Sequence, residues 1–159
     1  MKTHPFIIAV SLLLGAVGSH AAAWNEPDAV LGRSWGATPA EVNVPNCTTD
    51  DCWTVARLGP FAAVGVSFYF HSGHGLNAVR VWGVSQHHYA AFRAAFDELY
   101  GQPTSMETEE TTVGDVKVPS ELVRWQGQRV TIVLRERCER ANLSCASIRL
   151  NAPRDRAEQ

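Results

Sequence analysis

Four histidines in one short stretch are the residues whose type and spacing most directly suggest chemistry. His71-x-x-His74 and the adjacent pair His87-His88 place four imidazoles within 18 residues, and imidazole nitrogen is a favoured ligand of zinc and copper. A predicted strand of about 7 residues separates the two pairs, and at ~3.3 Å per residue it sets them roughly 20 Å apart. A joint site is therefore not expected, and His71 and His74 alone remain as candidate metal ligands.

An enzyme would need further groups beside this histidine pair. Asp50 and Asp51 are adjacent carboxylates, although neighbours in sequence do not by that fact face one another. The stretch 83–87, Gly-Val-Ser-Gln-His, lacks the final glycine of a nucleophile elbow. One functional hypothesis is thus a small periplasmic hydrolase or metal-binding protein that uses His71 and His74 with Asp50 or Asp51.

Tryptophans supply the other signal. Trp82 and Trp125 lie in predicted strands and are expected in the core, whereas Trp24, Trp35 and Trp53 lie in stretches without a clear element. An exposed tryptophan is a favoured anchor of protein interfaces. Trp24, Trp35 and Trp53 are therefore the candidate partner-binding residues.

Residues 1–23 have the pattern of a secretory signal peptide. Lys2 precedes an apolar run from Phe6 to Val17, and the three alanines 21–23 form a small-residue cleavage site. The run is well short of the ~20 apolar residues that cross a bilayer. We expect export to the periplasm, cleavage before Trp24, and no membrane insertion afterwards.

The four cysteines fit this compartment, because an even count in an exported protein favours disulfides. Three pairings are possible. We expect Cys47–Cys52 and Cys138–Cys145, since each pair is close in sequence and brackets a short loop.

Charge limits the possible partners. The chain has 159 residues with 14 Lys and Arg against 16 Asp and Glu, a net charge of −2, which speaks against nucleic acid as the main partner. The charge is uneven: residues 24–121 carry 5 basic and 12 acidic side chains, and residues 122–159 carry 8 basic and 4 acidic. Such a division could steer a charged partner to one face. No motif implies a cofactor.

The elements that must position these residues are one helix and a set of strands. Thr38, Pro39 and Glu41 are typical of the start of a short helix. Apolar residues at helical spacing predict a longer helix over 85–100, ended by Gly101. Period-2 alternation and short apolar runs predict five strands, namely 64–70, 76–82, 122–125, 130–134 and 146–150.

Hairpin connections between these strands imply an antiparallel sheet of about five strands, in the order strand, strand, helix, strand, strand, strand. One apolar helix stripe needs one sheet face to cover it, so the expected fold is two-layer α+β. We expect a single domain over residues 24–152 with a frayed tail at 153–159. The acidic segment 104–120 is either a small hairpin with its tip at 113–116 or a mobile loop.

Two motifs stand out along the chain. The first is the opening 35–42, Trp-Gly-Ala-Thr-x-x-Glu-Val, and the second is the helix end 99–103, Leu-Tyr-Gly-Gln-Pro, followed by Trp125 in an apolar hairpin. Both resemble motifs of a broad group of small exported bacterial proteins. Members of that group are largely without assigned function. The resemblance therefore supports the fold and the compartment and transfers no catalytic residue.

The leading hypothesis is a non-catalytic periplasmic protein that binds a protein or cell-envelope partner, of inhibitor, immunity or envelope-accessory type. Export, disulfide-closed loops and surplus aromatics favour it, as does the lack of a complete reaction motif.

Overall fold

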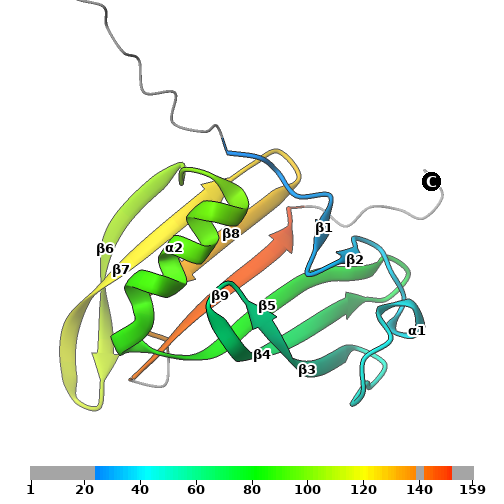
Figure 1. Cartoon of the computed structure of the whole chain (residues 1–159), viewed down its shortest axis with the longest axis horizontal. Coiled ribbons are helices and arrows are strands. Elements are labelled where there is room, and N and C mark those ends of the chain that lie inside the picture. Colours follow the sequence, from blue (N-terminus) through cyan, green and yellow to red (C-terminus); the bar gives the residue numbers. More distant parts are fainter. Residues whose placement is uncertain (1–23, 139–141, 152–159) are drawn as a thin grey trace, which may run out of the picture.

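The structure, a computed structural model, describes residues 24–138 and 142–151 (Figure 1). The predicted signal peptide 1–23 and frayed tail 153–159 lie outside these residues. Within the described ranges, no helix has the length and apolar character needed to cross a membrane.

A seven-stranded antiparallel sheet forms the body of the fold, in the spatial order β3-β4-β5-β9-β8-β7-β6 (Figure 1). Its strands are β3 (Asp51–Leu58), β4 (Phe61–His71), β5 (Gly75–Ser85), β6 (Ser105–Val113), β7 (Val116–Gln126), β8 (Val130–Arg135) and β9 (Leu143–Leu150). A separate two-stranded sheet joins β1 (Ala29–Val30) to β2 (Arg33–Ser34). The helices are α1 (Pro39–Val42), a 3₁₀ turn (Gln86–His88) and α2 (Tyr89–Tyr100).

The expectation of about five strands in this order was wrong. The fold is α+β in kind, but the described chain is mostly β, with seven strands in the main sheet and two more beside it. The missed strands of the main sheet, β3 and β6, are its two edges. Segment 104–120 is not a mobile loop, because it forms most of the β6–β7 hairpin, whose tip is the predicted turn from Val113 to Val116.

One face of the sheet carries the core. In β4 the side chains of Val64, Val66 and Phe68 are buried, as the period-2 pattern predicted. Helix α2 runs across this face in Figure 1 and packs Phe92 and Phe96 toward it. Because α2 covers only one face, the alternate side chains of the strands point to the other.

The long helix starts and ends close to the predicted residues. Ser85 occupies the cap position of the 3₁₀ turn, but its side chain makes no capping hydrogen bond. Gly101 ends the helix with a φ of 79°, in the left-handed region that glycine tolerates best. At the last turn, burial raises the pKa of the Tyr100 hydroxyl to about 12.

The segment before β3 covers the rest of the core face. Thr38 and Glu41 form the predicted capping box at the start of α1. Val30 and Val42 are fully buried in the same core as α2. The backbone of Leu76 exchanges two hydrogen bonds with this segment, to Gly36 and Ala37, so the start of β5 is fastened to it.

Both predicted disulfides are present. Cys47 is bonded to Cys52, and Cys138 to Cys145. The first closes the turn that leads into β3, and the second joins the loop after β8 to β9. The presence of two disulfides is compatible with an exported protein.

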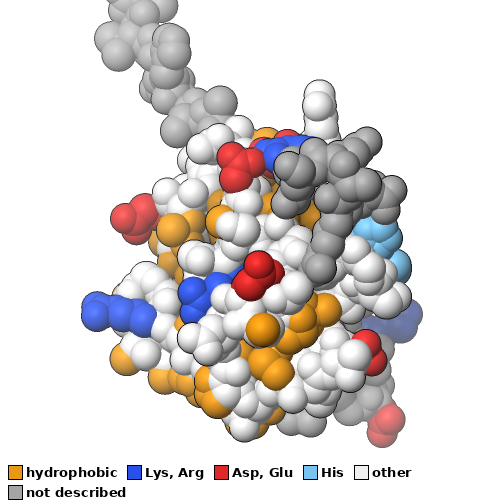
Figure 2. Space-filling view, turned by 90° about the vertical axis from the view of Figure 1, so that its right-hand side faces the viewer, with side chains coloured by type: hydrophobic (Ala, Val, Ile, Leu, Met, Phe, Trp, Pro, Cys, Tyr) orange, Lys and Arg blue, Asp and Glu red, His pale blue; other side chains and the backbone are white. Residues whose placement is uncertain are grey.

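The division between an acidic and a basic segment does not survive folding. Arg124 lies 3.8 Å from Glu107, and Arg135 lies 2.9 Å from Glu109. Arg129 similarly reaches Glu26 and Asp28 near the start of the described chain. Figure 2 shows acidic and basic side chains interspersed on the visible face. Antiparallel pairing places the two segments side by side, so their charges partly neutralise each other.

Candidate functional site

The histidine pair lies at the turn between β4 and β5. The rings of His71 and His74 are 4.9 Å apart between centroids. Asp50 lies beside the end of β4, where its carbonyl accepts the backbone N–H of Phe70. Among the described residues, no three His, Cys, Asp or Glu side chains are grouped as metal ligands. His87 and His88 follow the far end of β5, so the two histidine pairs do not meet.

A polar cluster joins α2 to β7. The Tyr89 hydroxyl donates to Glu121 at 2.6 Å, and Arg93 bonds Glu121 at 2.9 Å and Asp97 at 3.1 Å. Burial, followed by the hydrogen bond to Glu121, raises the pKa of Tyr89 far above its usual range. Through these contacts the cluster fastens α2 to β7.

The three candidate tryptophans have different surroundings. Trp35 is 5% exposed and donates its indole N–H to the carbonyl of Pro27, so it belongs to the core. Trp24 is partly buried and packs edge-to-face against Tyr100. Trp53, in contrast, stands on β3 with 47% of its surface exposed.

The exposed Trp53 belongs to a larger group. On the sheet face opposite α2, four large side chains from three neighbouring strands remain in contact with solvent. We call them the aromatic face: Trp53 (47% exposed), Val55 (58%), Tyr69 (37%) and Trp82 (41%). Trp82 was expected in the core, and this is a correction. Its neighbours Val79 and Val81 fill the core side of β5, which leaves Trp82 on the alternate side.

Strand register brings this group together. Gly65 pairs with Trp82 and with Val55, while Ser67 pairs with Trp53 and Arg80. The indole of Trp82 lies over Gly65 and donates to the Ser67 hydroxyl at 3.1 Å. A Cβ at residue 65 would come within 2.5 Å of the indole ring. The absence of a side chain at Gly65 therefore lets Trp82 lie flat on the sheet.

Replacing Gly65 by alanine should displace the Trp82 ring. The backbone of Gly65 needs no left-handed conformation, so crowding of the indole is the main expected effect, with a loss of about 1–3 kcal/mol in unfolding free energy. Tryptophan fluorescence detects the displacement, and chemical denaturation measures the stability. Comparison with the Trp82→Phe variant shows which component of the fluorescence comes from Trp82. If Gly65→Ala leaves that component and the stability unchanged, the proposed contact is wrong.

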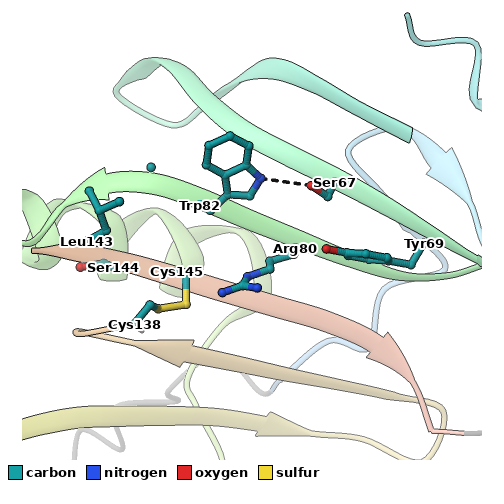
Figure 3. A pocket seen from close by; sticks show the side chains of 9 residues that line it. Ser67, Tyr69, Arg80, Trp82, Cys138, Leu143, Ser144 and Cys145 are labelled. Carbon is teal, nitrogen blue, oxygen red and sulfur yellow. Dashed lines mark hydrogen bonds between the residues drawn. A yellow bond between two sulfur atoms is a disulfide. The ribbon is translucent and has the colours of Figure 1, made fainter. Parts of the chain in front are cut away.

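A groove runs from the aromatic face to the Cys138–Cys145 disulfide. Its first cavity has a volume of about 390 Å³, with Tyr69 and Trp82 on one side and the disulfide on the other. Figure 3 shows Arg80 reaching from β5 toward the disulfide. A second cavity of about 570 Å³ shares Arg80 and the disulfide and continues toward β6. Arg80 thus lies between the two cavities.

The arginines of the uncovered face fall into two sets. Arg124 and Arg135, on β7 and β8, are paired with glutamates of β6. The side chains of Arg57, Arg80 and Arg149 make no hydrogen bond or ion pair with any described residue. The unpaired set lies on β3, β5 and β9, around the aromatic face.

Sequence reasoning missed Tyr69, Arg80 and Trp82 as site residues. The signal that could have found them is the period-2 pattern itself, since they alternate with the apolar residues that predicted β4 and β5. Chemically, this site can bury apolar surface and pair with negative charge. Comparison of the chain with protein-family models, curated proteins and solved structures gives no match.

Proposed function

We propose that the protein is a non-catalytic, exported binding protein of the periplasm whose aromatic face docks onto a partner protein. One observation carries this proposal: Trp53, Val55, Tyr69 and Trp82 are exposed together on a sheet face that no described element covers. Large exposed apolar groups that lie together are typical of interaction sites.

The composition of the face favours a protein partner. Tryptophan, tyrosine and arginine are the residue types enriched at interface hot spots. Here Trp53, Trp82 and Tyr69 are interleaved with Arg57 and Arg80 on three adjacent strands. The strand backbone fixes the spacing of these residues, and the Trp82 indole is held by its hydrogen bond to Ser67, so part of the surface is preorganised and less entropy would be lost on binding.

A catalytic role has less support. The two cavities of the groove are lined by neither His71 nor His74, and Asp50 and Asp51 are equally absent from their walls. The groove offers aromatic, hydroxyl and guanidinium groups, which recognise a ligand. An inhibitor, an immunity protein and an envelope-assembly accessory would each need such a face.

The test compares two sides of the same molecule. Mature protein carrying a C-terminal affinity tag is incubated with periplasmic extract of the source bacterium, as wild type and as Trp53→Ala and Trp82→Ala. The matched controls are Leu99→Ala and Met106→Ala, because both side chains are exposed (54% and 60%) but lie on the helix side. A truncated hot spot costs about 2 kcal/mol, roughly 30-fold in Kd.

We expect the same partner to be retained by the wild type and by both controls, and lost from both tryptophan variants. Circular dichroism and thermal unfolding establish that each variant is folded. If no partner is retained, or if the helix-side variants lose it equally, the proposal is wrong.

A further inference from the structure

We infer that the partner presents an acidic, partly apolar polypeptide segment, and that Arg80 binds a carboxylate of that segment in the cavity beside Trp82. This inference rests on the proposed function and names the chemistry of the partner. It depends on the charge of the groove, whereas the proposed function depends on the aromatic side chains.

Arg80 lies between the two cavities of the groove. Its side chain is half-buried in the groove and meets no described acceptor. Guanidinium is a rigid fork of N–H donors that matches a carboxylate in bidentate geometry. Elsewhere on this face, Arg135 lies 2.9 Å from a glutamate oxygen. Arg80 therefore has the chemistry of an arginine whose acidic partner comes from another molecule.

The two cavities differ in which charged side chains line them, and this difference favours one of them. Arg80 is the charged residue lining the first cavity. The second is lined by Arg80, Arg135 and Arg137 but also by Glu109 and Glu110. There Arg135 is already paired with Glu109 at 2.9 Å, so an incoming carboxylate would meet two carboxylates and an arginine that is not free. The carboxylate is thus expected on the Trp82 side of Arg80, in the cavity of about 390 Å³.

The residues that line this cavity indicate which kind of group accompanies the carboxylate. Tyr69, Trp82 and Leu143 provide apolar surface around the guanidinium. The volume lies within the ~300–1,000 Å³ of typical ligand sites, which leaves room for an apolar group besides the carboxylate. An Asp or Glu next to an aliphatic or aromatic residue fits this combination.

The charge around the cavity favours a local acidic segment over an extended polyanion. Arg57 and Arg149 flank the aromatic face and are as unpaired as Arg80 among the described residues. The full chain, however, has a net charge of −2. A membrane or nucleic acid would extend beyond the basic patch and meet acidic surface, whereas a polypeptide segment would contact the patch alone.

The experiment selects peptides without assuming a sequence. A phage-displayed library of random dodecapeptides is panned against the immobilised mature protein. Kd values of the enriched peptides are then measured in low and high salt for the wild type and for five variants: Arg80→Gln, Arg80→Lys, Arg124→Gln, Trp53→Ala and Trp82→Ala. Arg124→Gln is the matched control, because this arginine lies on the same face but is 3.8 Å from Glu107.

We expect enriched peptides to contain Asp or Glu beside an apolar residue. Arg80→Gln should weaken their binding at least tenfold and Arg80→Lys less, since the ammonium lacks the bidentate fork. Arg124→Gln should change it by less than about twofold. High salt should weaken wild-type binding more than Arg80→Gln binding, because part of the attraction is screened.

Any of four results overturns the inference. The first is enrichment of peptides without acidic residues, or of none. The second is binding that Trp53→Ala or Trp82→Ala abolishes but Arg80→Gln leaves intact, which removes the carboxylate site and keeps the proposed function. The third is Arg80-dependent binding to phosphatidylglycerol vesicles or to a single-stranded oligonucleotide, tested in parallel. Peptide binding that depends on neither Arg80 nor the tryptophans overturns both proposals.

Discussion

Replacing Gly75 by alanine is expected to lower the free energy of unfolding by about 3–5 kcal/mol. Gly75 has a φ of +70°, in the left-handed region. A Cβ at this residue would lie 2.1 Å from the carbonyl oxygen of Gly36 and 2.8 Å from that of Ala37. Both atoms belong to backbone, so no side chain can move aside. Strain and overpacking therefore add.

The consequence should be visible in one part of the molecule. Gly36 donates its N–H to the carbonyl of Leu76 at 2.9 Å, and Leu76 donates to Ala37 at 2.8 Å. Separating this segment from β5 would release Trp35 and Val42 from the core they share with β5. Hydrogen exchange should thus show lost protection at the amides of Gly36 and Leu76.

Gly73 supplies the control, because it lies in the same turn with a φ of +83° and no atom within 4 Å of its ideal Cβ. Gly73→Ala should cost only the conformational strain, about 1–2 kcal/mol. Urea denaturation of the two variants measures the difference. Equal losses would mean that the close approach of Gly36 to Gly75 does not occur.

Periodicity within short stretches of sequence explains why much of the sheet face that α2 covers was predictable. Alternation at Val64, Val66 and Phe68 indicates both a strand and the side that is buried. Helical spacing at Phe92 and Phe96 does the same for α2. Both disulfides followed from short separations along the chain. In each case the signal and the contact lie within a few residues of one another.

The edge strands carry no such signal. The segment from Ser105 to Val113 is polar or acidic at most positions, which favours a loop over a buried strand. Charge on an edge strand is nevertheless useful, because it opposes pairing with another molecule. Strand β3, from Asp51 to Leu58, exposes Trp53 and Val55 on one side. It also starts between the two cysteines of the Cys47–Cys52 disulfide, so its sequence suggested a loop.

The candidate site was the least predictable part, because it depends on what covers each face of the sheet. Within β5 the period-2 pattern places Val79 and Val81 opposite Arg80 and Trp82, but it does not say that the second side stays uncovered. The arginines pose a similar problem. Arg80 and Arg124 are alike in sequence, and only the positions of glutamates on β6 make one paired and the other unpaired. Such neighbours come from distant segments.

Trp125 and Trp53 offer the sharpest comparison between a core tryptophan and a proposed docking tryptophan. Trp125 is fully buried, packs against Phe96 with ring centroids 6.0 Å apart, and donates its indole N–H to the carbonyl of Gly101 at 2.8 Å. Trp125→Ala should therefore lower the unfolding free energy by about 3–5 kcal/mol. Trp53→Ala removes a half-exposed side chain and should cost about 1 kcal/mol or less.

Trp125→Phe separates packing from the hydrogen bond at the end of α2. It keeps an aromatic ring beside Phe96 but leaves the Gly101 carbonyl without its donor, so we expect an intermediate loss of about 1–3 kcal/mol. Chemical denaturation followed by circular dichroism measures all three variants. If Trp53→Ala is as destabilising as Trp125→Ala, Trp53 is held by packing within the molecule. The side chains of the aromatic face would then stabilise the folded state, and their partial exposure would no longer favour a partner.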